Sequence, residues 1–283
     1  MASEMKENLE DILQEKILSE MPLGGGCIAN SMKIETESGK TYLLKRYNDK
    51  RIHKTEAHGL IELKKAEAIR VPEVIAVSED YLLVEFINQG NKGKDFSEEF
   101  GRRLADLHRF ENDLFGFYEN NFIGSNEQIN QPQCTDWATF YWDNRLMYQF
   151  RLAEKNGYVT EELQKAFSQL ENKIHEILDD IVERPSLLHG DLWGGNYMVD
   201  EFGKPVLIDP AVYYGHREAD LAMTKIFGGF DSAFYSAYHE ALPLQNGYRE
   251  RENIYKLYHI FNHLNLFGGT YYEQTLSLIK YYL

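Results

Sequence analysis

This sequence has few cysteines, no long apolar run and a shortage of positive charge. Cys27 and Cys134 are the only two cysteines among its 283 residues, which gives no disulfide framework and suits a reducing compartment. No apolar stretch approaches the roughly 20 residues of a membrane-spanning helix. The acidic N-terminus also lacks the apolar segment of a secretory signal. We therefore expect a cytoplasmic protein that does not bind membranes.

The charge balance excludes a further class of partner. Thirty Lys and Arg residues against 45 Asp and Glu residues give a formal net charge of -15 at pH 7. Nucleic acids require dense positive charge on a protein surface, so we expect no nucleic-acid partner, although a local cationic pocket for a nucleotide is compatible. The hydrophobic share of 43% is typical of a globular chain rather than a disordered one. The length suffices for one large domain or two lobes.

Residues 1–87 predict a small β-rich lobe. Apolar residues at helical spacing predict a first amphipathic helix that ends before Pro22: Leu9, Ile12, Leu13 and Ile17. Three consecutive glycines then predict a turn between antiparallel strands. Strands are expected over Lys33–Thr36, Tyr42–Lys45, Val74–Val77 and Tyr81–Ile87, with a helix over Arg51–Ile69 that Pro72 closes.

Residues 88–283 predict a larger, mainly helical lobe. The polar segment Asn88–Lys94 is the expected linker between the lobes. Helices are expected over Phe96–Arg109, Trp137–Ala153 and the apolar stripe from Leu163 to Leu178, with short strands around Leu187, Met198 and Leu207. Capping-box spacings predict helix starts at Asp95 with Glu98 and at Thr270 with Glu273. The chain is therefore expected to be an α+β protein with two lobes.

One stretch places three polar residues in a fixed order. Asp191 lies in the segment His189–Asn196, Asn196 follows it by five residues, and Asp209 follows Asn196 by thirteen. This is the layout of a phosphoryl-transfer site, in which a carboxylate orients the acceptor hydroxyl and takes its proton while two oxygen ligands hold Mg²⁺ beside the phosphates. Singly, Asp191 could be a buried loop residue, Asn196 a turn residue and Asp209 a helix cap. The joint spacing favours catalysis.

Lys45 and Glu56 extend this site into the first lobe. Lys45 lies on an expected strand beyond the glycine turn, and Glu56 lies on the following helix. A strand lysine that contacts the nucleotide phosphates and is positioned by a helix glutamate recurs in kinases. The alternative is a surface lysine and a solvated glutamate. The backbone N–H groups of Gly24, Gly25 and Gly26 would approach the phosphates, and the absence of a following Gly-Lys-Ser/Thr disfavours a P-loop NTPase.

Other residues around this layout are candidates for binding or support. The backbone of Glu85, Phe86 and Ile87, at the expected lobe junction, could pair with an adenine edge, or the segment could be a plain edge strand. Trp193 could stack on a sugar ring or serve only in packing. Asp220 is expected to hydrogen-bond the catalytic loop and order it.

Two further patterns are weaker. His259 and His263 are four residues apart, but no third ligand accompanies them, so helix packing or a polar contact near the pocket is favoured over zinc binding. Cys27 lies beside the glycine turn, and we hypothesise that its oxidation perturbs the phosphate loop. Equal activity of reduced and peroxide-treated protein would refute that hypothesis.

Together these residues resemble the fructosamine kinase family, also called ketosamine-3-kinases, within the aminoglycoside and choline kinase branch of the protein-kinase-like fold. The resemblance spans nearly the whole chain. The segments that carry it are His189–Asn196, Ile208–Ala211, Tyr214–Met223, Leu257–His259 and Asn262–Gly269, with further matches at Gly101, Leu104–Ala105, Leu107–His108 and Phe115–Phe117. Two features depart from known patterns: Ala29 lies near the place of a protein kinase's third glycine, and the polar segment Gly124–Thr135 has no counterpart that we can name.

The resemblance implies ATP-dependent phosphorylation, with Mg²⁺, of the 3-hydroxyl of a ketosamine. A ketosamine is an early glycation adduct, either free or attached to a protein lysine, and its phosphorylated form is prone to fall apart and release the amine, which repairs the glycation. The resemblance also implies that Asp191 is the proton acceptor and Glu85–Ile87 the adenine-binding segment. Trp193, His216 and Arg217 are further candidates for contact with the substrate. We expect a monomer or weak dimer.

Two other functions stay open from the sequence. One is a kinase for another small hydroxylated substrate, such as an aminoglycoside or a choline-like alcohol, which a panel of acceptors in an ADP-release assay would distinguish. The other is a nucleotide-binding regulator without activity, which would bind ATP with Mg²⁺ but transfer no phosphate.

Overall fold

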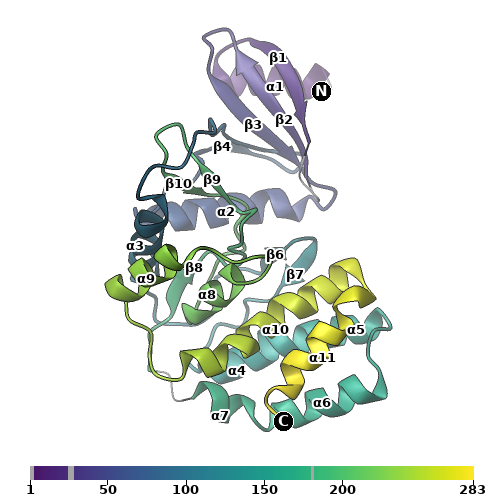
Figure 1. The fold of residues 1–283 in the computed structure, drawn as a ribbon. Helices are drawn as coiled ribbons and strands as arrows, with labels where there is room; N and C mark the ends of the chain where they lie inside the picture. Colours follow the sequence, from purple (N-terminus) through teal and green to yellow (C-terminus); the bar gives the residue numbers. More distant parts are fainter. Residues whose placement is uncertain (1–2, 25–28, 180–181) are drawn as a thin grey trace.

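The structure is a computed structural model that describes residues 3–24, 29–179 and 182–283. A sheet lies at the N-terminal end and a group of helices at the C-terminal end, with helix α2 between them (Figure 1). The strands are β1 (Ile17–Leu23), β2 (Asn30–Thr36), β3 (Thr41–Arg46), β4 (Val74–Val77), β5 (Leu82–Glu85), β6 (Asn121–Ile123), β7 (Asn126–Gln128), β8 (Ser186–Leu188), β9 (Tyr197–Val199), β10 (Pro205–Leu207) and β11 (Tyr213–Gly215). The helices are α1 (Ser3–Leu13), α2 (Arg51–Lys65), α3 (Phe96–His108), α4 (Trp137–Tyr141), the π-helix η1 (Trp142–Met147), α5 (Tyr148–Lys155), α6 (Glu161–Glu171), α7 (Ile174–Leu178), α8 (Glu218–Thr224), α9 (Ser232–Ala241), α10 (Tyr248–Phe267), the 3₁₀-helix η2 (Gly269–Tyr271) and α11 (Tyr272–Lys280).

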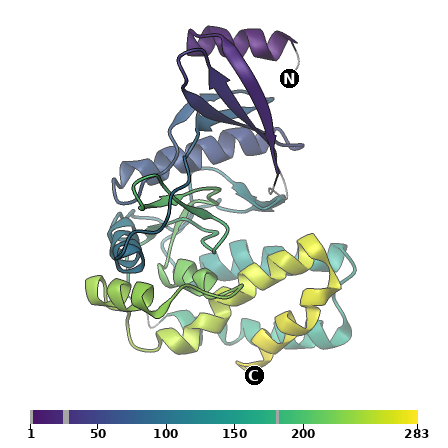
Figure 2. The same ribbon diagram turned by 45° about the horizontal axis from the view of Figure 1, so that its top comes forward.

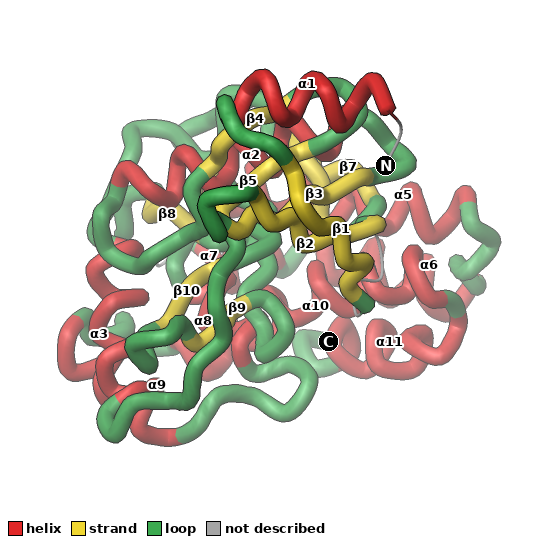
Figure 3. The backbone as a smooth tube through the Cα atoms, turned by 90° about the horizontal axis from the view of Figure 1, so that it is seen from above, coloured by secondary structure: helices red, strands yellow, loops and turns green. Residues whose placement is uncertain are grey.

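The N-terminal sheet is antiparallel throughout and has the strand order β1-β2-β3-β5-β4. In β5, Leu83 belongs to an apolar cluster with Leu9 of α1, whereas Leu82 and Val84 belong to the core that contains Leu60 of α2. Because side chains alternate between the two faces of a strand, α1 and α2 cover opposite faces of the sheet. Figure 3 shows α1 beside these strands at the near end of the molecule.

The N-terminal helix is shorter than predicted. α1 ends at Leu13, the next residue Gln14 has a φ of 54°, and Ile17 begins β1. Ile17 is buried in the same apolar cluster as Leu9, so the spacing between them reflects a shared core and not a shared helix. Pro22 lies within β1 instead of after a helix. β1 is at the edge of the sheet, where a missing N–H is tolerated.

The remaining predicted elements form, with corrected ends. The four strands expected over residues 33–87 are β2 to β5, and α2 ends at Lys65, shortly before Glu67 with its φ of 52°. The stripe from Leu163 to Leu178 forms two helices instead of one. Neither predicted capping box is present: the Asp95 side chain makes no cap hydrogen bond, and Thr270 lies in η2 before α11 begins. The spacing predicted the start of α3 correctly, since Asp95 is its N-cap residue, but it placed the start of the last helix too early.

The larger lobe is built around α10. This helix packs against α5, α8 and α11, at the end of the molecule opposite α1 (Figure 2). Its Leu257, Phe261 and Leu264 have no exposed surface and belong to the main core, so burial of one face holds the helix in place. Within the described ranges, no helix is both long and apolar enough to cross a bilayer.

The linker between the lobes runs against the β9–β10 hairpin. The Gly90 N–H donates to the Val199 carbonyl at 3.0 Å, and a Cβ at Gly90 would lie 2.3 Å from the Asp200 carbonyl oxygen, so a glycine is required there. Arg70 forms ion pairs with Glu85 of β5 at 2.6 Å and with Asp200 after β9 at 2.9 Å. We propose that the two lobes divide at this linker, between residues 1–87 and 88–283.

Candidate active site

A cavity of about 330 Å³ lies between the sheet and the helical lobe. Side chains from distant parts of the sequence line it. Those that the sequence singled out are Lys45, Glu56, Asp191, Trp193, Asn196, Asp209 and His263. The structure therefore brings the two halves of the predicted site together.

Strand alternation places Lys45 in this cavity. Its neighbour Leu44 is buried in the cluster on the α1 side of the sheet, so Lys45 faces the opposite way, toward α2. Lys45 Nζ lies 2.5 Å from Glu56 Oε1 and 2.5 Å from Asp209 Oδ1. Burial opposes the charge of Lys45, but the carboxylates of Asp209 and Glu56 outweigh it and hold the lysine pKa well above its ordinary value. Lys45 thus stays charged and joins one carboxylate from each lobe.

Glu56 has a second donor that the sequence did not reveal. The Tyr47 hydroxyl donates to Glu56 Oε2, and Tyr47 also lines the cavity. Burial raises the pKa of Glu56, partly offset by the Lys45 charge. The position of Tyr47, two residues beyond Lys45 on the same side of the chain, is the one signal that could have identified it.

The loop before Asp191 is fixed by buried hydrogen bonds. Gly190 has a φ of 84°, and a Cβ there would lie 1.9 Å from the Ala211 carbonyl oxygen, so only glycine fits. The Asp220 carboxylate accepts the N–H of His189 at 2.7 Å and of Gly190 at 2.8 Å, which confirms the expectation that Asp220 hydrogen-bonds this loop. The Asp191 N–H donates to His189 Nδ1 at 3.2 Å. The backbone around Asp191 is therefore set before any substrate binds.

Asp191 and Asn196 contact each other directly. Asn196 Nδ2 donates to the Asp191 carbonyl at 2.8 Å and to its Oδ2 at 3.1 Å. Burial raises the pKa of Asp191 well above its ordinary value; Asn196 opposes this shift, and the nearby carboxylates of Asp209 and Asp220 add to it. A carboxylate with a raised pKa is a stronger base than an ordinary one, which suits proton acceptance.

Asp209 reaches the cavity by a turn after β10. It has a φ of 53°, an uncommon conformation for a residue with a side chain. The preceding Ile208 N–H donates to the Asn196 carbonyl at 3.1 Å. Partial removal from water opposes the charge of Asp209, but Lys45 outweighs this effect and lowers the carboxyl pKa. This strained turn thus presents an ionised carboxylate beside Asn196.

The described residues of the predicted nucleotide-binding segments do not line the cavity. Gly24 is exposed at the end of β1, and Gly25, Gly26 and Cys27 fall outside the described residues. Among the described residues that line the cavity, none belongs to Glu85–Ile87. The carboxylate of this segment pairs with Arg70, as described above.

His216 and Arg217 are not brought to the cavity. The His216 ring packs 4.7 Å from that of Trp137 and is buried. Arg217 forms a 2.6 Å ion pair with Glu183 and donates to the Leu242 carbonyl at 2.9 Å. Both side chains contact partners within the helical lobe, and neither lines the cavity.

Several other cavity residues were not among the predicted site residues, although Asn262, Leu266 and Phe267 lie in a segment that carries the family resemblance. Phe122 comes from the β6–β7 hairpin, and Asn262, Leu266 and Phe267 come from α10. The α10 residues reach the cavity of Asp191 through the packing of that helix in the core. His263 also lines the cavity, and no cluster of three or more potential metal ligands occurs in the part of the chain that the structure describes.

The chain is similar to known proteins along its whole length. A family profile described as fructosamine kinase matches residues 1–283. The chloroplastic protein-ribulosamine 3-kinase of Arabidopsis thaliana is 37% identical over 291 residues, which cover 97% of this chain and 88% of that protein. The crystal structure of a Haemophilus somnus protein assigned as a fructosamine-3-kinase aligns with a TM-score of 0.88 at 27% identity, over 99% of this chain and 96% of that one. An ADP-bound aminoglycoside phosphotransferase aligns with a TM-score of 0.69 at 13% identity over the full length of both chains. The expected α+β, two-lobed, protein-kinase-like fold is confirmed.

Proposed function

The chain belongs to the fructosamine kinase family, and from this premise we propose that it transfers the γ-phosphate of ATP to the 3-hydroxyl of a ketosamine. One observation carries the proposal beyond family membership. A base candidate, Asp191, faces the same cavity as the pair Asn196 and Asp209 and the lysine Lys45 with its partner Glu56. Phosphoryl transfer needs this combination, because its catalysis consists of positioning and charge stabilisation.

Asp191 is the proposed catalytic base. A sugar hydroxyl is a poor nucleophile, and a carboxylate within hydrogen-bond reach orients it and accepts its proton late in the reaction. Asn196 Nδ2 holds Asp191 Oδ2, which leaves Oδ1 of the same carboxylate for the acceptor hydroxyl. The raised pKa of Asp191 strengthens this base.

The residues beside Asp191 fit a Mg²⁺ ion. Asn196 uses its nitrogen for Asp191, so its oxygen is available as a ligand, and the Asp209 side chain is half exposed to the cavity, with a relative exposure of 51%. Both supply the oxygen donors that Mg²⁺ prefers. When bound, the ion would neutralise charge on the phosphates.

Lys45 is the proposed phosphate contact, with Glu56 and Tyr47 as its positioning residues. It now pairs with Asp209, and phosphate oxygens would replace part of that pairing when nucleotide binds. Gly24, Gly25 and Gly26 would hold the phosphates through their backbone, and the backbone of Glu85–Ile87 would hold the adenine.

The proposed acceptor is a free or protein-bound ketosamine. Phosphorylation at the 3-hydroxyl makes the adduct prone to release its amine, so the consequence would be deglycation. We further propose a cytoplasmic protein that acts as a monomer or weak dimer, without nucleic-acid or membrane partners. The acidic net charge of -15 supports the last point.

The test is an ADP-release assay with ribulosamine, erythrulosamine and fructosamine side by side, in the presence of ATP and Mg²⁺. We expect turnover of at least one ketosamine and none with the Asp191→Asn variant. Aminoglycosides and choline serve as comparison acceptors. Turnover of those alcohols without turnover of any ketosamine would contradict the proposal.

A further inference from the structure

One end of the cavity carries an aromatic group that the proposed chemistry does not use. We call Trp193, Phe227, His263, Phe267 and Tyr271 the aromatic rim. Ring centroids lie 5.8 Å apart between Trp193 and Phe227, 4.8 Å between Phe227 and His263, and 5.4 Å between His263 and Phe267. Tyr271 lies 5.2 Å from His263. The rim therefore forms one continuous set of contacts that begins two residues after the proposed base.

The rim is apolar but not buried. Trp193, Phe227 and Phe267 have relative exposures of 36%, 47% and 57%. Trp193, His263 and Phe267 line the cavity, and Phe227 contacts two of these three from outside it. Exposed aromatic side chains that border a pocket are a feature of ligand-binding sites.

Phe227 is held in a conformation that costs energy. Its φ is 58°, followed by 101° at Gly228 and 72° at Gly229. A left-handed backbone is unfavourable for a residue with a side chain, and Phe227 is too exposed for burial to repay that cost. Such outliers persist where the surrounding structure imposes them, and they cluster at functional sites.

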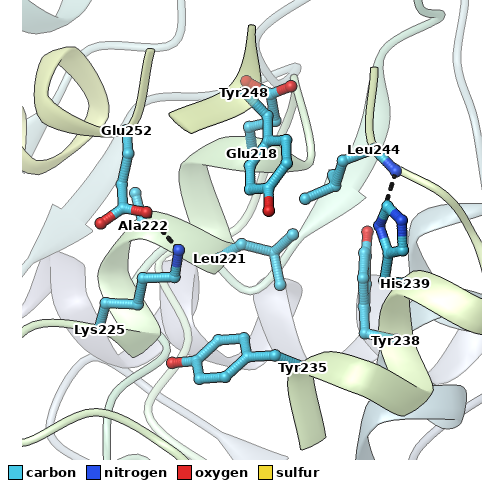
Figure 4. A pocket seen from close by; sticks show the side chains of 10 residues that line it. All are labelled: Glu218, Leu221, Ala222, Lys225, Tyr235, Tyr238, His239, Leu244, Tyr248 and Glu252. Atoms are coloured by element: carbon cyan, nitrogen blue, oxygen red, sulfur yellow. Dashed lines mark hydrogen bonds and ion pairs between the residues drawn. The ribbon is translucent and has the colours of Figure 1, made fainter. Parts of the chain in front are cut away.

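The surrounding structure does impose this conformation. The Tyr235 hydroxyl joins both ends of the loop, because it lies 3.0 Å from Thr224 Oγ1 and accepts the Phe230 N–H at 3.3 Å. At the base of the loop, Lys225 pairs with Glu252 and lies 5.5 Å from the centre of the Tyr235 ring. Figure 4 shows Lys225, Glu252 and Tyr235 among the side chains that line a small pocket. The side chains that support the loop form part of the lining of this pocket of about 80 Å³, and we assign it no ligand.

His263 adds a polar group to the rim. Its Nδ1 lies 2.7 Å from the His259 carbonyl oxygen. Because a carbonyl oxygen can only accept a hydrogen bond, Nδ1 carries the hydrogen, and Nε2 of the neutral ring keeps its lone pair. Burial lowers the pKa of His263, which keeps the ring neutral. A neutral imidazole nitrogen accepts hydrogen bonds from a protonated amine, and aromatic faces attract the same cation.

We propose that the aromatic rim binds the amine-bearing half of the ketosamine and that Phe227 selects for adducts with an extended apolar substituent on the amine, such as a lysine side chain. This inference rests on the proposed function. In a ketosamine the amine is attached to C1, two carbons from the 3-hydroxyl, so an acceptor held at Asp191 has its amine within one sugar length of Trp193. The methylenes of a lysine side chain then lie along Phe227 and Phe267, while a small amine does not reach them.

The experiment compares ketosamines that share one sugar and differ in the amine: methylamine, butylamine and Nα-acetyl-lysine adducts. The readout is the ratio of kcat/KM for the Nα-acetyl-lysine adduct to that for the methylamine adduct. For Phe227→Ala we expect this ratio to fall about tenfold, carried by KM, since an aromatic contact contributes roughly that much to discrimination. For the positioning residue, Tyr235→Phe should lower the same ratio by a smaller factor, because it removes the hydroxyl that holds the loop.

Two control variants separate the loss of the Phe227 ring from a general loss of an exposed aromatic side chain and from a change in backbone strain. Phe202→Ala removes an equally large, 75% exposed phenylalanine from the β9–β10 turn, which does not line the cavity, and it should leave the ratio unchanged. Phe227→Gly removes the ring and also the backbone strain, so it should fold at least as stably as the parent by thermal denaturation and show the same loss of selectivity. An unchanged ratio in both Phe227 variants would overturn this inference alone. Failure of the parent enzyme to phosphorylate any ketosamine would instead overturn the proposed function.

Discussion

Replacement of Glu56 by Gln tests how Lys45 is kept ready for the nucleotide. Glu56 is 7% exposed and accepts from Lys45 Nζ at 2.5 Å and from the Tyr47 hydroxyl. The substitution keeps the size and one acceptor oxygen but removes the charge. Lys45 is then left with Asp209, a proposed Mg²⁺ ligand, as its only carboxylate among the contacts described above, and its charge is paired with that residue alone. We therefore expect nucleotide and Mg²⁺ binding to weaken together.

The size of this effect follows from the contact that is lost. A hydrogen bond with a charged partner contributes about 1.5–3 kcal/mol, and the lower end applies because the Asp209 contact remains. A loss of about 1.5 kcal/mol corresponds to a roughly tenfold weaker affinity. The assay is the KM for ATP at several Mg²⁺ concentrations, with the dissociation constant of ATP measured by calorimetry. We expect KM for ATP to rise about tenfold and the Mg²⁺ requirement to increase.

Glu62→Gln is the matched control on the same helix. Glu62 is also buried, at 8% exposure, and accepts from the Tyr214 hydroxyl and from Lys65, each at 2.7 Å, but it does not line the cavity. It should lower thermal stability without a change in KM for ATP. If Glu56→Gln leaves KM for ATP and the Mg²⁺ dependence unchanged, or if Glu62→Gln alters them equally, the assigned role of Glu56 is refuted.

Three further predictions concern the loop around Asp191. Asp191→Asn should lower kcat by about 10²- to 10⁴-fold while calorimetry shows unchanged ATP affinity; near-parental turnover would rule Asp191 out as the base. The base must be deprotonated, so kcat/KM for the acceptor should be lost as pH falls through a pKa raised above the ordinary aspartate value of 3.8 by burial, and a pH profile flat down to pH 4 would argue against this. Gly190→Ala should destabilise the protein by about 3 kcal/mol, from left-handed strain and a close contact with Ala211. In thermal denaturation, Gly194→Ala, where an added Cβ meets nothing within 4 Å, should be far milder, and equal effects would contradict the geometric argument.

The sequence predicted those site residues that lie close to one another along the chain. Asp191, Asn196 and Asp209 flank one hairpin, so their spacing reports their placement directly. Lys45 and Glu56 were identified because a strand and the next helix face each other across a short connection. The outline of two lobes followed in the same way, from apolar periodicity on either side of a polar linker.

What the sequence did not reveal depends on contacts between distant segments. The spacing of Leu9 and Ile17 predicted that they share a helix, but they belong to different elements that share a core. His216 and Arg217 lie in a family-like stretch, but their partners Trp137 and Glu183 come from elsewhere in the fold. Phe227 reaches Trp193 only because a tyrosine hydroxyl closes its loop. Such contacts join segments that are far apart in the sequence, so they cannot be predicted from a short stretch of it.

The path of the linker has a mechanical consequence. The β9–β10 hairpin begins after Asn196 and ends before Asp209. The linker is hydrogen-bonded to the other end of this hairpin: the Gly90 N–H donates to the Val199 carbonyl, and the Gly93 N–H donates to the Gly203 carbonyl at 3.2 Å. Arg70 ties the same turn to β5. The hairpin therefore contacts the connection between the lobes at one end and is flanked by both proposed Mg²⁺ ligands at the other. Because the Ile208 N–H donates to the Asn196 carbonyl at 3.1 Å, Asn196 and Asp209 are tied to each other, and a rotation of the sheet against the helices is expected to shift both proposed ligands together relative to Lys45.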